Sequence, residues 1–258
     1  MPVKIATWNV NSLRVRLSHV ADWASAAQPD VLCLQETKLP DSEFPLDAIR
    51  ELGYRTIFSG QKTYNGVATL CKATPEEVAT ELPGADDPQR RVLMANIDGV
   101  RVLNVYVPNG QAVDSDKFQY KLAWLERLIT FVEGELEAGR RLIVLGDFNI
   151  APEDQDVYDP EAWRGKVLCS DPERSMFQRL IELGLKDVFR KFEQEPNSFS
   201  WWDYRAAAFR RNMGLRIDHI LAGPTDYQRC TGCAIDKAPR KWERPSDHAP
   251  VVATFVAR

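Results

Sequence analysis

Short apolar runs separated by polar stretches rich in Gly, Pro and Asp dominate the chain. Their β-branched content and their length are typical of buried β-strands rather than of helices. Strands are therefore predicted over residues 4–10, 30–37, 66–72, 92–97, 101–107, 141–150, 215–223 and 249–256.

Three segments repeat their apolar residues every three to four positions, which predicts helices with one buried face. The clearest is 116–138, which Ser115 would cap and Gly139 would end. The others are 174–184 and a segment ending before Pro29, in which Leu17, Val20, Ala24 and Ala27 recur. The alternation of strands and helices predicts an α/β fold. Because no repeat, linker or low-complexity tract divides the chain, we expect one domain over residues 1–258.

Polar side chains stand at or near the ends of successive predicted strands, except that Asp218 lies within one strand and Asp247–His248 precedes the last. They are Asn9 and Asn11, Glu36, Tyr106 with Asn109, Asp147 and Asn149, Asp218, and the pair Asp247–His248. Open α/β sheets tend to carry their sites at strand ends, because the loops there hold polar groups while the strands stay rigid. A single loop carboxylate is more often structural than catalytic, but a polar tip on so many strands predicts one shared site.

The carboxylates and amides of this set are hard oxygen ligands, and no cysteine is among them. Such ligands favour Mg²⁺ or Mn²⁺ over zinc. His248 would act as an electrophile or a base, and a third carboxylate such as Asp218 would hold its imidazole in one tautomer. A carboxylate beside a divalent cation could take a proton from water, which is the chemistry of phosphoester hydrolysis. His19 is expected at the surface or its boundary, and His219 on the strand face opposite Asp218.

Composition changes this picture little, but charge distribution adds to it. Of 258 residues, 44% are hydrophobic and 27% charged, as in ordinary globular proteins. The net charge of −4 argues mildly against nucleic-acid binding. However, residues 205–216 hold four arginines and no acid, and residues 237–244 are also basic. These segments would hold a polyanion, or they are simply solvated basic loops.

The five cysteines are an odd number in a chain whose first residues lead directly into a strand rather than a signal peptide. Free thiols and a cytoplasmic location are therefore expected. Cys230 and Cys233 form an isolated C-x-x-C, for which a structural zinc or redox role is the less favoured interpretation. No apolar run reaches the ~20 residues of a membrane span.

Seven motifs then carry a family resemblance: "TWNVNSLR", "LQETK", "NVYVPNG", "GDFNIAP", "FSWWDYR", "GLRIDHIL" and "PSDHAPV". In this order, and across residues 4–256, they resemble the endonuclease/exonuclease/phosphatase superfamily. Within it, the chain is most similar to bacterial exonuclease III-type enzymes, the abasic-site (AP) endonucleases of base excision repair. The resemblance implies a four-layer α/β sandwich: two mixed sheets packed face to face, helices outside, and the site at one edge.

The resemblance also implies roles for the polar tips. Glu36 would be the principal ligand of a Mg²⁺ ion, which Mn²⁺ could replace, and the wider ligand set would be Asn9, Glu36, Asp147, Asn149, Asp247 and His248. Asp147 would activate the attacking water, and Asn149 would bind the phosphate. Tyr106 would contact the scissile phosphate or ionise. His248, oriented by Asp218, would donate to a phosphate oxygen. One-metal and two-metal versions stay open, and Asn11 stands where some relatives carry an aspartate.

The implied substrate is double-stranded DNA with abasic sites or 3′ ends, bound by a monomer. Trp201, Leu215 and Ile217 would form an apolar pocket for a flipped-out sugar that lacks its base; alternatively, these side chains belong to the core. Arg205, Arg210 and Arg211 would grip phosphates, and Asn109 completes the expected substrate contacts. Residues 156–174 correspond to a loop that would contact DNA beside the lesion.

Three other functions stay open beside abasic-site incision combined with 3′-end trimming. A 3′ exonuclease with little abasic-site activity would have the same fold and catalytic residues. A catalytically silent DNA-binding relative is disfavoured, because each catalytic position keeps a competent residue. A phosphoinositide or sphingomyelin phosphodiesterase is disfavoured by the basic loops and by the lack of membrane-facing amphipathic segments.

Overall fold

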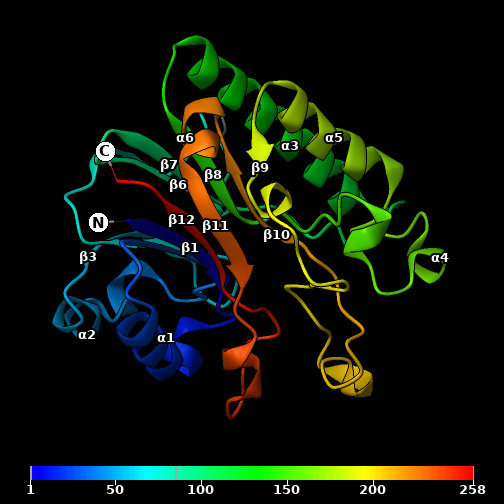
Figure 1. Ribbon diagram of the computed structural model, residues 1–258, viewed down its shortest axis with the longest axis horizontal. Coiled ribbons are helices and arrows are strands. Elements are labelled where there is room, and N and C mark those ends of the chain that lie inside the picture. The colour runs from blue at the N-terminus through cyan, green and yellow to red at the C-terminus, as the bar shows by residue number, and fades with distance from the viewer. Residues whose placement is uncertain (1, 85, 258) are drawn as a thin grey trace.

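The computed structural model describes residues 2–84 and 86–257, which form two six-stranded sheets packed face to face (Figure 1). The first sheet has the order β11 (Cys230–Ile235), β12 (Val251–Phe255), β1 (Val3–Asn9), β2 (Val31–Gln35), β4 (Val67–Cys71) and β3 (Arg55–Ser59). The second has the order β5 (Glu76–Ala79), β6 (Val92–Ile97), β7 (Val100–Tyr106), β8 (Leu142–Asp147), β10 (Asp218–Ala222) and β9 (Lys186–Asp187). Both sheets mix parallel and antiparallel pairs.

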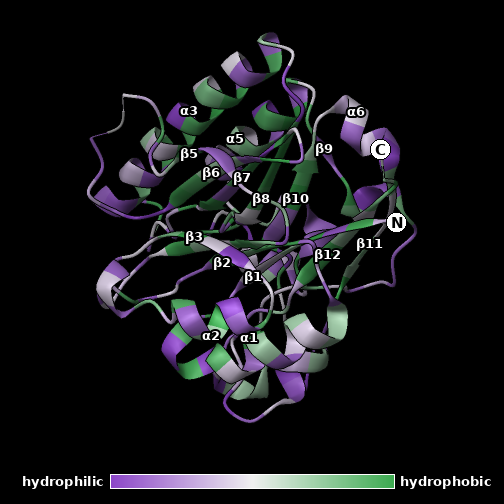
Figure 2. Ribbon diagram, turned by 90° about the vertical axis from the view of Figure 1, so that its left-hand side faces the viewer, coloured by the Kyte–Doolittle hydropathy of each residue, from purple (hydrophilic) through white to green (hydrophobic). Residues whose placement is uncertain are grey.

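Helices cover the outer face of each sheet (Figure 2). Helices α1 (Leu13–Ala27) and α2 (Leu46–Glu51) lie against the first sheet, and α3 (Asp116–Glu137) and α5 (Asp171–Glu182) against the second. The shorter helices are α4 (Pro160–Trp163) and α6 (Pro224–Arg229). The expected four-layer α/β sandwich is thus confirmed. Within the described residues, no helix is long and apolar enough to span a bilayer.

Three apolar layers separate the four structural ones, which explains why the strands are almost continuously apolar. In β8, Ile143 and Leu145 point into the core between the sheets, whereas Val144 points into the core beneath α3 and α5. In β1, Ile5 faces the other sheet and Trp8 faces α1. A strand that is buried on both faces has no polar side to alternate with.

Most predicted elements are present, with shifted bounds. The segment 141–150 leaves the sheet after Asp147, so its last three residues are loop. Helix α5 begins at Asp171 instead of 174, because Ser170 and Glu173 form a capping box at its start. The last two predicted strands correspond to β10 and β12, which begin at Asp218 and Val251, later than predicted.

The C-x-x-C segment is an edge strand, β11. A bulge between Cys230 and Gly232 shifts the register, so both Cys230 and Cys233 turn into the core between the sheets. Burial raises the pKa of both thiols. All five cysteines are free and buried, as expected, and neither thiol of the pair joins a metal-binding cluster among the described residues. Packing against the core accounts for this motif.

Strand register brings the polar tips to one edge of the sandwich. Tyr106 on β7 lies opposite Asp147 on the parallel strand β8, and Asp218 on β10 lies opposite the same aspartate. In the first sheet, Asn9 lies opposite the residue that precedes Glu36. The loop before β12 adds His248. Both sheets thus contribute to one site, as their strand-end residues predicted.

Candidate active site

Glu36, Asp147 and His248 form a compact cluster where the two sheets meet. One ligand atom of each lies within 4.8 Å of the others. Asn9 links the two carboxylates, because its Nδ2 donates 2.8 Å hydrogen bonds to Glu36 Oε1 and to Asp147 Oδ2. The cluster therefore concentrates negative charge in a place that is largely closed to water.

The imidazole of His248 is held from behind. Its Nδ1 lies 2.9 Å from Asp218 Oδ2, which also accepts a 2.6 Å bond from the Ser200 hydroxyl. Its Nε2 is directed toward the cluster, 3.8 Å from Asp147 Oδ2. Burial alone would lower the pKa of His248, but Asp218 and Asp147 together raise it to about 10. At neutral pH His248 is thus an imidazolium, with one N–H on Asp218 and the other free to donate.

Asp147 is fully buried, and its surroundings favour the neutral carboxyl over the charged carboxylate. Burial raises the pKa of its carboxyl to about 7; the charges of Asp218 and Glu36 act in the same direction, and His248 opposes them. A divalent cation would offset this cost of burying an anion. The oxygen donors of Glu36 and Asp147 suit Mg²⁺ or Mn²⁺, so the residues present fit such an ion.

The backbone around these residues adopts unusual conformations. Glu36 follows β2 with φ 52°, and Asn149 follows β8 with φ 49°, both in the left-handed region that non-glycine residues rarely adopt. Gly146 precedes Asp147 with φ 150°, and a Cβ there would lie 1.9 Å from the Val105 carbonyl oxygen. The glycine of the "GDFN" motif thus lets β7 and β8 approach closely, and this approach places Asp147 beside Tyr106.

Tyr106 lies between the acidic cluster and a cation. Burial raises its pKa well above 10, and the charges of Glu36 and Asp147 add to that effect. Of the two roles open to Tyr106, a neutral phenol that donates a hydrogen bond suits this geometry better than an ionised one. The guanidinium of Arg91 lies 4.5 Å from the ring centroid, and Nη1 donates 3.1 Å to the Tyr106 carbonyl.

Three expected ligands point elsewhere. Asn9 presents its amide nitrogen to the cluster, while its oxygen accepts from the Asn11 amide N–H at 2.9 Å. The Asn149 oxygen accepts from Asn109 Nδ2 at 3.1 Å. Asp247 is bound by Trp201 Nε1 at 3.0 Å and Asn11 Nδ2 at 2.9 Å. Of the predicted set, only Glu36, Asp147 and His248 converge. The two carboxylates are the ones free to hold an ion, because the imidazolium of His248 has no free lone pair. The wider ligand set stays a prediction.

Sequence reasoning missed several residues that hold the site. Lys38 lies 2.8 Å from Glu36 Oε2, and Ser200 binds Asp218. Both stand within the motifs "LQETK" and "FSWWDYR", so a search for second partners of each carboxylate could have found them. Arg91 stands before β6 in a segment with no such signal.

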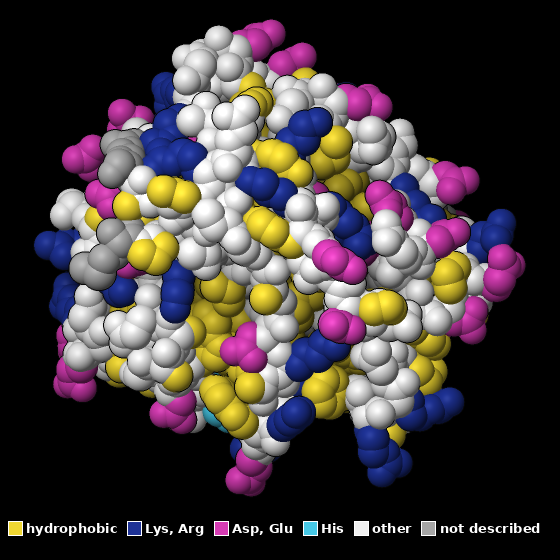
Figure 3. Space-filling view, viewed as in Figure 1, with side chains coloured by type: hydrophobic (Ala, Val, Ile, Leu, Met, Phe, Trp, Pro, Cys, Tyr) yellow, Lys and Arg dark blue, Asp and Glu magenta, His cyan; other side chains and the backbone are white. Residues whose placement is uncertain are grey.

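The expected DNA-binding residues divide into two groups. Arg205, Arg210 and Arg211 are exposed on a loop that projects at the lower right of Figures 1 and 3, where basic side chains gather. By contrast, Leu215 and Ile217 are only 0% and 1% exposed. They pack in a small core with Ala151, Val157, Leu168 and Cys169, and Trp201 lies against it. In this conformation the apolar pocket is closed, and its use by a sugar stays a prediction.

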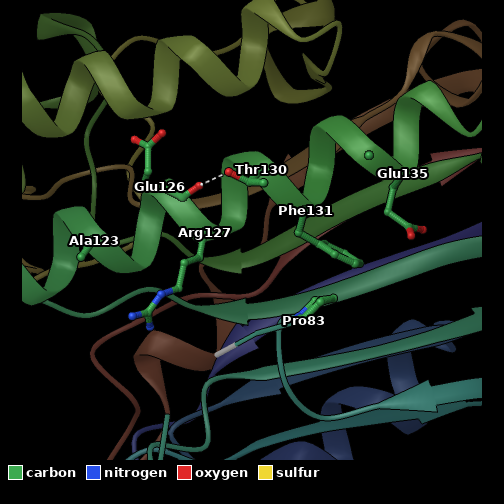
Figure 4. Close-up of a pocket in the computed structure, with 8 residues that line it drawn as sticks. Pro83, Ala123, Glu126, Arg127, Thr130, Phe131 and Glu135 are labelled. Carbon is green, nitrogen blue, oxygen red and sulfur yellow. Dashed lines mark hydrogen bonds between the residues drawn. The ribbon is translucent and has the colours of Figure 1, made fainter. Parts of the chain in front are cut away.

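One of the large surface grooves lies away from the site. The groove between α3 and the segment that carries Pro83, with a volume of about 590 Å³, is shown in Figure 4. It is lined by Pro83, Ala123, Glu126, Arg127, Thr130, Phe131, Gly134 and Glu135, and none of these is a predicted site residue. A second groove of about 590 Å³ borders the site, where Arg91 and Asn109 line it. Because the two volumes are equal, the chemistry of the side chains identifies the active site.

Residues 6–248 match the model of the endonuclease/exonuclease/phosphatase family. The chain belongs to this family. As a family member it is 36% identical to exodeoxyribonuclease III of Haemophilus influenzae, an alignment that covers 98% of this chain and 100% of the relative. It is 49% identical to a Neisseria 3′ phosphatase solved with a product DNA hairpin, with a TM-score of 0.97 over 99% of this chain and 100% of the other.

It is also 40% identical to an AP endonuclease from Archaeoglobus fulgidus, with a TM-score of 0.95 over 99% of this chain and 100% of that one. The predicted resemblance to exonuclease III-type family members is confirmed.

His219, as expected, points away from Asp218, and it makes folding sensitive to acid. Its Nε2 donates 2.9 Å to the Ile150 carbonyl, so its Nδ1 accepts from Arg216 at 3.0 Å. Burial, followed by the charge of Arg216, lowers its pKa from 6.5 to about 4. Between these values only the unfolded chain takes up the proton, so stability present above pH 6.5 is lost as the pH falls toward 4.

This loss amounts to about 3 kcal/mol in the free energy of unfolding. Urea unfolding at stepped pH should show it in the wild type, and His219→Gln should lose correspondingly less over the same range. If the free energy of unfolding falls equally steeply with pH in the two proteins, the neutral tautomer assigned to His219 is wrong. His19→Gln is the comparison: burial also lowers the pKa of this imidazole on α1, but less than that of the fully buried His219, so this variant should stay closer to the wild type.

Proposed function

We propose that the chain is a Mg²⁺-dependent DNA repair nuclease that hydrolyses phosphodiesters 5′ of abasic sites and trims 3′ ends of duplex DNA. It acts as a monomer through one catalytic domain spanning residues 1–258. The observation that carries the proposal is the Glu36–Asp147–His248 cluster, formed at the sheet edge in a chain whose relatives are DNA repair nucleases.

Each side chain has a step suited to its environment. The imidazolium of His248, held by Asp218, donates to a non-bridging phosphate oxygen and stabilises the charge that grows there. Asp147 accepts the proton of the attacking water, a task that suits a pKa near the working pH. Tyr106 and Asn149 contact the phosphate. Mg²⁺, or Mn²⁺ in its place, would be held by Glu36 and Asp147 and would supply positive charge to the phosphate oxygens.

A 3′-5′ exodeoxyribonuclease or 3′-phosphodiesterase with little abasic-site activity is the second candidate. One observation favours it: Leu215 and Ile217 are closed off by their own small core. A flipped-out sugar would enter only if that core opened. The relatives include both kinds of enzyme, a 3′-5′ exonuclease from Neisseria meningitidis at 50% identity and an AP endonuclease at 40%.

One assay separates the two candidates. An end-labelled duplex with a central abasic-site analogue is incubated beside an undamaged duplex with a recessed 3′ end, each with Mg²⁺ and with EDTA. A single Mg²⁺-dependent cut 5′ of the lesion supports the repair endonuclease. A ladder from the 3′ end, with the lesion strand uncut, supports the second candidate. If neither product forms with Mg²⁺ or Mn²⁺, the DNA nuclease proposal is wrong.

The basic loop gives a prediction about salt. Binding of duplex DNA should weaken by about one log unit per log unit of salt for each phosphate contact. Replacing Arg210 and Arg211 together by Ala should lower this slope by about 2, as measured by fluorescence anisotropy. Replacing Arg50 on α2 and Arg127 on α3, both exposed outside the sandwich, should leave the slope unchanged. Equal slopes for wild type and the loop variant would show that this loop does not hold DNA.

A further inference from the structure

Lys121 is a lysine that the proposed chemistry does not use, yet its side chain is completely buried. It stands on α3 with 0% exposure. Its ammonium group binds the carboxylate of Glu173 and donates to two backbone carbonyls, those of Asn149 at 2.6 Å and Asn109 at 3.1 Å. An ammonium has three N–H donors, so each of them has a partner.

Glu173, in the first turn of α5, is equally buried and equally well satisfied. Besides Lys121, its carboxylate accepts from the backbone N–H of Leu168 at 3.0 Å, the N–H of Ser170 at 3.2 Å and the Ser170 hydroxyl. Buried ion pairs contribute little net stability, because the cost of removing both charges from water offsets much of their attraction. A pair whose hydrogen bonds all end on loops is better suited to fixing those loops.

The loops held by Lys121 carry site residues. Asn109 Nδ2 donates 3.1 Å to Asn149 Oδ1, and Asn149 Nδ2 donates 3.0 Å to the Val107 carbonyl. The Asn149 backbone N–H donates 2.9 Å to Asp147 Oδ1. Asn149 has φ 49°, a conformation that persists only where its surroundings enforce it. Lys121 binds the carbonyl of that same residue.

We propose that Lys121 and Glu173 are positioning residues that fix Asn149 and Asn109 for the phosphate at the reacting centre. Neither contacts the substrate; Lys121 acts through the two carbonyls, and Glu173 acts by holding Lys121 and the loop at Leu168–Ser170 together. The inference rests on the proposed function, since it takes Asn149 as a phosphate contact. A misplacement of about 1 Å in such a group can cost about 10²-fold in rate.

The main test replaces both charges, Lys121→Met with Glu173→Met, so that neither is left buried alone. We expect a cooperatively folded protein with kcat lower by about 10²-fold and KM within about threefold, since transition-state alignment is lost rather than binding. The matched control removes Arg141 and Asp226 in the same way. That ion pair lies at the start of β8, whereas Asp147 is the last residue of this strand. Its removal should therefore leave kcat unchanged.

A double-mutant cycle with Asn149→Ala separates positioning from a merely structural role. If Lys121 acts through Asn149, Asn149→Ala should slow the wild type markedly and the Lys121/Glu173 variant by less than about threefold. Fully multiplicative losses would overturn the positioning role. If Asn149→Ala leaves the wild-type rate intact, the phosphate role of Asn149 in the proposed function is wrong and the inference falls with it. If the Lys121/Glu173 double variant does not fold, Glu173→Gln replaces it in the cycle, because Gln has nearly the volume of Glu. The loss of rate in Glu173→Gln must then also be less than multiplicative with that of Asn149→Ala.

Discussion

Replacing Asp147 by Asn is expected to slow DNA cleavage by at least about 10³-fold while DNA binding survives. The amide keeps the shape of the carboxylate, but its single oxygen can accept from only one of the two donors that Asp147 binds, Asn9 Nδ2 or the Asn149 N–H. It cannot take a proton from water or carry the charge that a divalent cation requires. Single-turnover cleavage under excess enzyme, with binding measured separately by anisotropy, checks this expectation.

Asp47→Asn is the control for this variant, because Asp47 lies on α2 with a side chain that is 94% exposed. It should cleave like the wild type. If Asp147→Asn keeps a rate within tenfold of the wild type, the water-activating role belongs to another residue.

Replacing His248 by Gln should cause a loss of similar size, at least about 10³-fold, for a different reason. The variant retains a hydrogen-bond donor but loses the positive charge that Asp218 and Asp147 maintain by raising the pKa of His248 to about 10. Stabilisation of charge in the transition state therefore falls while substrate binding changes little. Steady-state kinetics should show the loss in kcat, with KM nearly unchanged.

Asp218→Asn tests how His248 is held. Its loss should be smaller than that of His248→Gln, and in the double variant the two losses should not multiply, because both act through one imidazole. Multiplicative losses would mean that Asp218 serves catalysis by another route. His19→Gln should leave the rate unchanged.

The sequence predicted the architecture and the centre of the site because both rest on strand patterning. Continuous apolar runs predicted strands buried on two faces, as β8 is. A polar residue at the end of such a run is expected at a sheet edge, so Glu36 and Asp147 could be placed together before their distances were known. Asp218 lies within the predicted strand 215–223, and the family resemblance is what placed it behind His248.

The sequence did not predict the short or exposed edge strands, nor the directions in which individual side chains point. The strands β3, β5, β9 and β11 were not predicted; β5 is largely exposed, β9 has only two residues and β11 is an edge strand. Whether Asn9 presents its oxygen or its nitrogen depends on Asn11, which lies two residues away on a turn. Lys121 was placed within the predicted helix, but a lysine on a helix is usually solvated, and nothing in the local pattern indicated its burial.

The apolar pocket shows the same limit. Trp201, Leu215 and Ile217 are adjacent, as expected, but whether apolar neighbours line a cavity or fill it is decided by residues far along the chain. Here Ala151, Val157 and Leu168 fill the space.

The most direct test of the account is the Mg²⁺ dependence of single-turnover cleavage, compared between the wild type and Glu36→Gln. Both are assayed on the lesion duplex and on the recessed duplex, so that the result does not depend on which substrate is preferred. The account predicts no cleavage in EDTA, recovery on addition of Mg²⁺, and a midpoint for Glu36→Gln at a Mg²⁺ concentration higher by about tenfold or more. Cleavage that persists in EDTA, or the same midpoint for both proteins, would contradict a metal site built on Glu36 and Asp147.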